Sequence, residues 1–130
     1  MKYSISLFVL LSITLFSCKK DKEDHVDFSG SISVTAPAAN DTITGGNSFT
    51  VTGNITGNIE MHGYMITVYN QNDQSIVYSN TIHSHSESYT LNETVTHTLT
   101  ASTPLRLVID VEVDHDGESL TKEVLFQYQP

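Results

Sequence analysis

The sequence predicts an all-β domain of about 100 residues, and three observations lead to this prediction. From about residue 30 onward, apolar and polar residues alternate with a period of two, the spacing of a half-buried strand. Clusters of glycine, asparagine and aspartate interrupt the alternation at intervals of roughly 8 to 15 residues, as turns between strands do. No segment of useful length repeats apolar residues at helical spacing, so we expect strands throughout this part of the chain.

Seven segments carry the alternation. The first ends at Pro37, because proline cannot donate a hydrogen bond to a neighbouring strand. The dipeptide Gly45-Gly46 turns the chain into the second segment, and the polar run 70–73 separates the third from the fourth. The dipeptide Asp116-Gly117 between the last two segments is the strongest hairpin signal of the chain. The predicted strands span residues 31–35, 49–55, 63–69, 75–82, 89–95, 105–113 and 120–126.

Seven short strands of this spacing suggest an immunoglobulin-like, seven-stranded antiparallel β-sandwich. In the clearest strand, every second residue from Leu105 to Val113 is apolar, and alternation likewise places Tyr64 on the core face. The sandwich would be without a disulfide, because Cys18 is the only cysteine, and the chain also lacks tryptophan. A small all-β barrel or a jelly-roll-like sandwich is the alternative.

The start of the chain predicts a removable targeting segment. Lys2 precedes an apolar run over residues 5–16, which is shorter than the roughly 20 residues that a membrane-spanning helix needs. The run ends at Leu15-Phe16-Ser17-Cys18, the pattern of a lipoprotein signal. We therefore expect a signal peptide over residues 1–17, a lipidated Cys18 with a charged tether over 18–29, and one β-sandwich domain over 30–130.

Residues 1 to about 24 resemble the lipoprotein precursors of Gram-negative bacteria, with Cys18 as the lipidated residue. The resemblance implies a multiply acylated cysteine, which would anchor the protein stably, since one acyl chain alone binds membranes marginally. Lys19, and not aspartate, follows the cysteine, so the resemblance implies no retention in the inner membrane. The charged tract 19–24 is similar to that of surface-exported lipoproteins of Bacteroidota type. The expected location is the outer membrane, on its periplasmic or cell-surface face.

Composition and motifs restrict the function. Acidic residues outnumber basic ones by 15 to 6, so nucleic acid and anionic lipid headgroups are poor partners, and the membrane contact is expected through the lipid alone. A single cysteine rules out a cysteine-based metal site. The chain has no nucleophile-elbow, phosphate-loop or His-Glu-x-x-His motif, and we expect a protein that is not an enzyme.

Histidine is the unusual feature, because five of the six histidines lie between residues 62 and 115. On a strand, His83 and His85 would project from the same face about 6.6 Å apart, close enough for both to reach one ion. In a sequential antiparallel sandwich, the second-to-third, fourth-to-fifth and sixth-to-seventh connections lie at the same end. They contain His62, the His83–His85 pair and His115, respectively. The first strand would start at this same end.

The predicted metal ligands are therefore His62, His83, His85 and His115, with Asp114 and Asp116 as further candidates and Glu60 beside them. Nitrogen-rich ligation favours zinc, copper or nickel over calcium. His97 falls at the opposite end and His25 in the tether, so neither belongs to the set. The segment 112–123 nearly matches the spacing of an EF-hand calcium loop, but its strand-like flanks favour a hairpin turn. Exposed loop histidines without a shared ligand are the alternative.

The motifs His62-Gly63-Tyr64, His83-x-His85 and Asp114–Gly117 resemble elements of Bacteroidota-type lipoproteins with a single immunoglobulin-like domain. The resemblance implies fold and location but no particular activity. Two hypotheses follow. The first is a lipid-anchored cell-envelope protein that binds a transition metal through its histidines. The second is a structural, adhesive or glycan-handling surface module without a metal site, whose protein or glycan partner the sequence leaves open.

Overall fold

The computed structural model of the protein describes residues 27–113 and 118–130. The predicted signal peptide (1–17), Cys18, most of the tether and the four residues 114–117 lie outside this described part. The described part consists of strands without any helix, and the predicted all-β class is confirmed. It therefore contains no helix long and apolar enough to span a membrane. The strands are β1 (Gly30–Ala36), β2 (Thr42–Thr44), β3 (Ser48–Asn70), β4 (Ile76–Thr96), β5 (Thr103–Glu112) and β6 (Ser119–Gln129).

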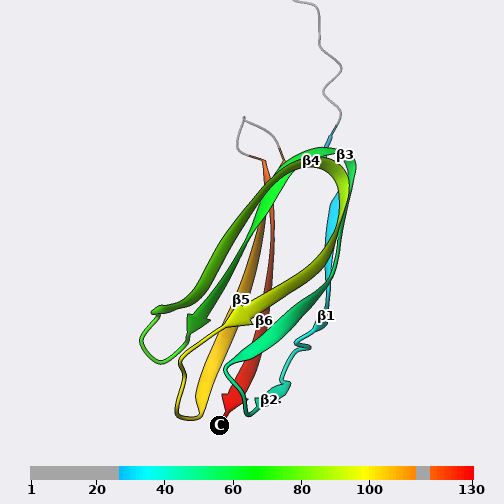
Figure 1. The fold of residues 1–130 in the computed structure, drawn as a ribbon. Helices are drawn as coiled ribbons and strands as arrows, with labels where there is room; N and C mark the ends of the chain where they lie inside the picture. Colours follow the sequence, from blue (N-terminus) through cyan, green and yellow to red (C-terminus); the bar gives the residue numbers. More distant parts are fainter. Residues whose placement is uncertain (1–26, 114–117) are drawn as a thin grey trace, which may run out of the picture.

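All six strands belong to one sheet that folds over on itself. The strand order is β1-β3-β5-β6-β2, and β4 pairs with β3 outside this path. The first half of β3 lies between β1 and the second half of β4, and its second half lies between β5 and the first half of β4. Both long strands curve together over one end of the molecule (Figure 1). We call this curved part, residues 57–62 of β3 and 83–88 of β4, the bend.

The core lies between the two halves of the folded sheet. Alternate residues of both halves of β3, of β5 and of β6 face inward, because apolar side chains recur at every second position. Tyr64 is 9% exposed, which confirms its predicted place on the core face. Each fully buried aliphatic side chain contributes about 1.5–3 kcal/mol through removal from water. The core side chains without exposed surface include Val51, Ile55, Met61, Ile66, Val68, Val95, Leu105, Leu107 and Ile109.

The number of strands differs from the predicted seven. The segments 49–55 and 63–69 are parts of the single strand β3, and the segments 75–82, from its second residue Ile76 onward, and 89–95 are parts of β4. The predicted connections between them are wrong, because both strands continue through the bend, where Met61 still pairs with Ser86. Two register shifts, between Thr56 and Met61 and between Met61 and Gly63, absorb the curvature there. Glycines and polar residues can signal a turn, but here they form a curved two-stranded ribbon.

The antiparallel prediction is also wrong for one pair of strands. Strand β2 pairs with β6 in parallel, so the sheet is mixed. The sequence analysis missed β2 because three residues are too few to show alternation. The backbone nitrogen of Asn40 donates to the Leu125 carbonyl (2.8 Å), and this contact aligns the segment before β2 with β6. Gly45 and Gly46 follow with φ angles of 66° and 74°, which confirms the predicted glycine turn into β3.

Gly63 allows β3 and β4 to pair directly beside the bend. Its φ is 139°, a conformation that residues with a side chain rarely adopt. A Cβ atom at this position would lie 2.1 Å from the carbonyl oxygen of Ile82 and 3.2 Å from Cα of His83. Only glycine therefore fits between these strands, and its absent side chain leaves free space on the sheet surface.

Candidate functional site at the bend

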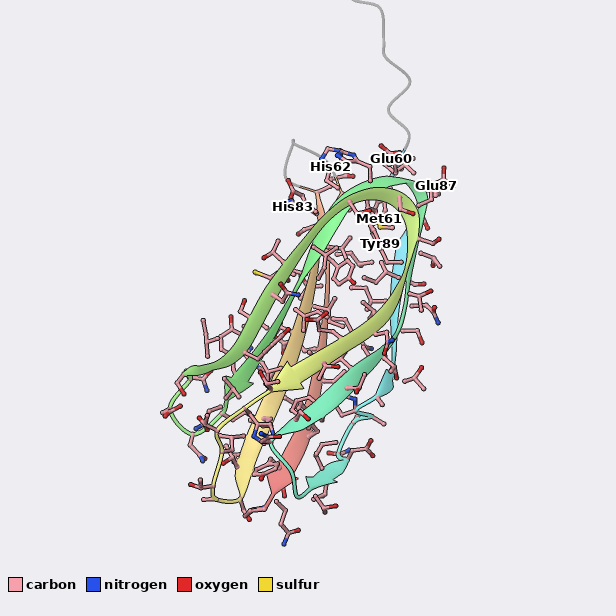
Figure 2. All side chains as sticks on the ribbon, viewed as in Figure 1. Glu60, Met61, His62, His83, Glu87 and Tyr89 are labelled. Atoms are coloured by element: carbon pink, nitrogen blue, oxygen red, sulfur yellow. The ribbon has the colours of Figure 1, made fainter. Side chains whose placement is uncertain are left out.

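Hydrogen bonds hold the bend from inside the folded sheet. Met61 is fully buried, and the hydroxyl of Tyr89 donates to the Met61 carbonyl at 3.0 Å. The same hydroxyl also contacts the Ser84 carbonyl, so one side chain joins β3 and β4 within the bend. Figure 2 shows Met61 and Tyr89 beneath the curved ribbon and Glu60, His62 and Glu87 around its outer end.

The N-terminal side of the domain begins beside the bend, as the strand order predicted. Gly30, the first residue of β1, is the register partner of Gly57. The backbone nitrogen of Asn58 donates to the Ser29 carbonyl (3.0 Å), and the Asn58 side chain donates to the carbonyl of Asp27 (3.0 Å). Asp27, the first described residue, therefore lies next to the bend.

The structure brings two of the predicted metal ligands, His62 and His85, into contact. Gly63 pairs with His83 and Met61 pairs with Ser86, so the single residue His62 lies opposite two residues of β4. The extra residue on β4 makes this a β-bulge, an irregularity that changes the direction of the side chains at that point of the strand. The ring centroids of His62 and His85 are 4.7 Å apart, with an interplanar angle of 48°.

A carboxylate engages one nitrogen of this pair. Oε1 of Glu60 lies 3.2 Å from Nδ1 of His85, and both side chains are more than 60% exposed. A carboxylate at Nδ1 favours the tautomer with the proton on Nδ1, so Nε2 carries the free lone pair. The sequence analysis placed Glu60 beside the histidines, and the structure assigns it this contact with His85.

His83 lies at the same end but in a different setting. It forms a row across the sheet with Gly63, Glu112 and Ser119, which are successive register partners in β3, β5 and β6. A groove of about 390 Å³ lies over this row, and His83, Met65 and Glu112 are among its lining residues. The missing side chain of Gly63 contributes to this space. In the view of Figure 2, His83 of β4 lies on the other side of His62 from Glu60.

The predicted set of four metal ligands is only partly described. His115, Asp114 and Asp116 lie outside the described residues. Within residues 27–113 and 118–130, no group of three or more histidine, cysteine, aspartate or glutamate side chains is arranged to hold a metal ion. The described residues thus supply the imidazole pair of His62 and His85, and participation of the other candidates stays a prediction.

A polar cluster that the sequence analysis missed joins the two halves of β4. The hydroxyl of Tyr78 donates to Oε1 of Glu93, and the Asn80 side chain donates to the same oxygen at 2.8 Å. The hydrogen bond to Glu93, with burial and the carboxylate charge adding to it, raises the pKa of Tyr78 to about 12. These residues lie 13 and 15 positions apart in one strand, and only the folding of β4 brings them together.

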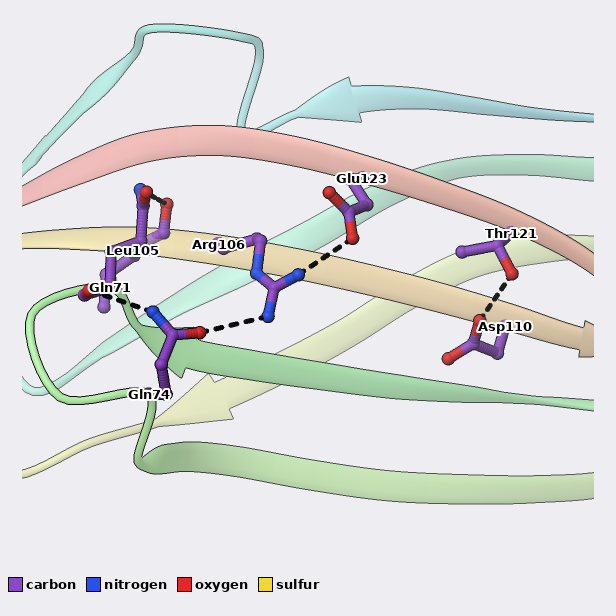
Figure 3. Close-up of polar contacts among 7 residues, drawn as sticks. All are labelled: Gln71, Gln74, Leu105, Arg106, Asp110, Thr121 and Glu123. Atoms are coloured by element: carbon purple, nitrogen blue, oxygen red, sulfur yellow. Dashed lines mark hydrogen bonds and ion pairs between the residues drawn. The ribbon is translucent and has the colours of Figure 1, made fainter.

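Polar side chains on the outer face of β5 are paired across strands (Figure 3). Arg106 donates to Glu123 at 2.9 Å and to Gln74 at 3.3 Å, and its guanidinium also lies 4.8 Å from the ring centre of Tyr69. Thr121 donates to Asp110 at 2.6 Å. Gln74 lies in the turn between β3 and β4, and the other contacts are ordinary cross-strand interactions that stabilise the sheet.

Comparisons with known proteins give likenesses of shape only. No family model and no curated protein matches the chain. Among solved structures, the chain is similar to the fibronectin(III)-like modules of Clostridium thermocellum CbhA, with 12% identity, a TM-score of 0.46, and coverage of 76% of this chain and 96% of that one. It is also similar to the E. coli chaperone DraB, with 10% identity, a TM-score of 0.47 and coverage of 79% of this chain. The chain spans about half of that chaperone, 55% of its length.

Proposed function

We propose that this protein is a non-enzymatic binding protein of the bacterial cell envelope, anchored through lipid on Cys18, which binds a transition-metal ion at the bend. The observation that carries the proposal is the contact between His62 and His85, with Glu60 at Nδ1 of His85. Metal-binding histidines commonly donate their other ring nitrogen to a carboxylate in this way, which fixes the tautomer and makes the ligand more basic.

The geometry of the pair suits a shared ion. Zinc binds histidine nitrogen at about 2.0–2.1 Å, so two ligand nitrogens lie within about 3.4 Å of each other, and rings in direct contact can meet this requirement. The exposed side chain of His85 lets an ion reach it without burying a charge. Imidazole ligands favour zinc, copper or nickel over calcium.

The remaining ligands are proposed from His83 and His115, with Asp114 and Asp116 as further candidates. The register of β5 supports this proposal, because Glu112 is the partner of Gly63, the residue after His62. The connection from β5 to β6 therefore starts beside the imidazole pair. Three protein ligands would leave a position open on the metal, and four would close a tetrahedral zinc site.

Binding of Zn²⁺ or Cu²⁺ to the full chain in mild detergent, measured in competition with a chromophoric chelator, tests the proposal. We expect the double variant His62→Ala/His85→Ala to lose at least tenfold in affinity, and Glu60→Gln to lose about tenfold, the usual effect of removing a partner of a ligand histidine. The variant His25→Ala is the matched control, because it removes a histidine of the tether. Unchanged affinity in the double variant would overturn the proposal.

The second hypothesis, a structural or adhesive module without a metal site, expects a large exposed apolar or tyrosine patch and scattered histidines. In the described residues, the exposed large hydrophobic side chains are Met65, Ile76 and Leu125. Ile76 and Leu125 are the two ends of a row of register partners that also contains Tyr69 and Arg106, and this row is an observation in favour of the second hypothesis. The imidazoles of His62 and His85 are in contact and not scattered. The contact between the two imidazoles is the observation that favours the metal-binding hypothesis.

A further inference from the structure

The end of the molecule opposite the bend contains a buried histidine that the proposed function does not use. His97 follows β4, and its backbone nitrogen donates to the carbonyl of Asn47 at 2.9 Å. Nearby, the nitrogen of Gly45 donates to the Gln129 carbonyl at 2.8 Å, and the hydroxyl of Tyr128 donates to the Gly46 carbonyl at 3.0 Å. We call this meeting point of residues 45–49, 97–99 and 128–129 the His97 corner.

Aromatic rings enclose the imidazole of His97, which is only 7% exposed. Its centroid lies 4.5 Å from the ring of Tyr128, in an edge-to-face arrangement, and 5.9 Å from the ring of Phe49. Nδ1 accepts a hydrogen bond from the backbone nitrogen of Leu99 at 3.4 Å. Nε2 is buried and has no hydrogen-bond partner among the described residues. Because Nδ1 accepts, the neutral ring carries its proton on Nε2.

The groups that face His97 offer no compensation for a positive charge. From β3 the facing side chain is Phe49, and from β6 it is the titratable Tyr128, whose ring contacts the imidazole edge-to-face. Burial alone lowers the pKa of His97, with no contribution from a charged neighbour.

We propose that His97 makes this corner sensitive to mild acid, so that the corner loosens while the bend at the other end stays closed. Protonation turns Nδ1 from an acceptor into a donor, which then faces the N–H of Leu99. It also places an unpaired charge between two aromatic rings that are packed into the core. The corner holds β2 against β6, so its loosening would release the end of the sheet at β2. This device is independent of the proposed metal site.

The direction of the effect follows from the two states of the histidine. In the open corner His97 has the ordinary pKa of about 6.5, and in the closed corner its pKa is lower. The stabilising contribution is therefore fully present above about pH 6.5 and is lost as the pH falls through the pKa of the closed state. When the pH falls from 7.5 to 5.5, the equilibrium ratio of closed to open corner should decrease by up to about tenfold.

Hydrogen exchange followed by NMR tests the proposal on the full chain, in detergent and with a chelator present. We expect the protection factors of the Gly45 and His97 amides, corrected for intrinsic exchange, to fall by up to about tenfold between pH 7.5 and 5.5. The Asn58 amide, which donates to Ser29 beside the bend, is the internal reference and should keep its protection. Equal loss of protection at Asn58 and at the corner would overturn the proposal.

The variant His97→Gln supplies the matched comparison, because its amide oxygen can still accept from Leu99 but does not titrate in this range. We expect the protection of its corner to be the same at both pH values. If this variant does not fold, the imidazole carbon shifts of His97 in the unmodified chain decide the matter directly. A titration midpoint clearly below 6.5 supports the proposal, and a midpoint at or above 6.5 refutes it.

Discussion

The substitution Gly63→Ala should strongly destabilise the protein, although it adds only one methyl group. Gly63 has a φ of 139°, and a Cβ atom there would lie 2.1 Å from the carbonyl oxygen of Ile82 in β4. Real Cβ atoms essentially never come within 3.0 Å of another heavy atom of this kind. Since the obstacle is backbone, no side-chain rotation can relieve it, and β3 and β4 have to separate next to the bend.

The expected magnitude combines two effects. Placing a non-glycine residue in a sparsely populated backbone region costs about 1–3 kcal/mol. Separating the strands weakens neighbouring ladder hydrogen bonds, each of which contributes about 0.5–1.5 kcal/mol net. We therefore expect Gly63→Ala to lose about 3–5 kcal/mol of the free energy of unfolding, with a fall in Tm of more than about 10 °C.

Equilibrium unfolding in urea measures this loss, and Gly45→Ala is the matched control. Gly45 also has a positive φ, 66°, but nothing lies within 4 Å of the position that its Cβ would take. The control should lose only about 1 kcal/mol, for the left-handed conformation itself. If Gly63→Ala lost no more than Gly45→Ala, the claim that a backbone contact at Gly63 requires glycine would be refuted.

Three further predictions concern the core, the polar cluster and the bend. Leu107 is fully buried, so Leu107→Ala should lower the free energy of unfolding, measured in urea, by about 2–5 kcal/mol. Leu125→Ala, at a site 48% exposed, should lower it by less than about 1 kcal/mol, and equal losses would contradict the assigned core. NMR titration of Tyr78 should give a pKa of about 12, so its stabilising effect is present below pH 10 and is lost as the pH rises from about 10 to 12. In Glu93→Gln the pKa of Tyr78 should return toward 10, and an unchanged pKa would disprove the hydrogen bond. Tyr89→Phe removes the hydroxyl that joins Met61 and Ser84, so the free energy of unfolding should fall by about 1–3 kcal/mol, and metal affinity should fall with it. A variant with wild-type stability would show that the bend does not depend on this hydroxyl.

The sequence predicted the strands well where local alternation determines burial. The apolar positions from Leu105 to Val111 are buried in β5 as expected, and Tyr64 lies on the core face. The breaks expected between 55 and 63 and between 82 and 89 do not occur. Glycines and serines there give the local signal of a turn, but the pairing of β3 with β4 and the packing of Met61 under the bend decide the structure. Both of these are contacts between distant segments.

The candidate site was predictable in location more than in geometry. The sequence placed His62 and His85 at one end of the fold, and the structure has their rings in contact there. The reason is different from the predicted one, since both histidines lie within strands and meet through a bulge. A bulge depends on the register of two strands, which the residues at these positions do not specify. The cluster of Tyr78, Asn80 and Glu93 was missed for the same reason.

X-ray absorption at the zinc edge of the zinc-loaded full chain identifies the ligands of the bound ion and so tests directly whether the bend binds metal through His62 and His85. We expect at least two imidazole ligands with Zn–N distances of about 2.0–2.1 Å. In the double variant His62→Ala/His85→Ala, the number of imidazole ligands should fall by two. A spectrum with only water or carboxylate oxygen around the ion, or one that the double variant leaves unchanged, would contradict the claim that the bend binds metal through these two histidines.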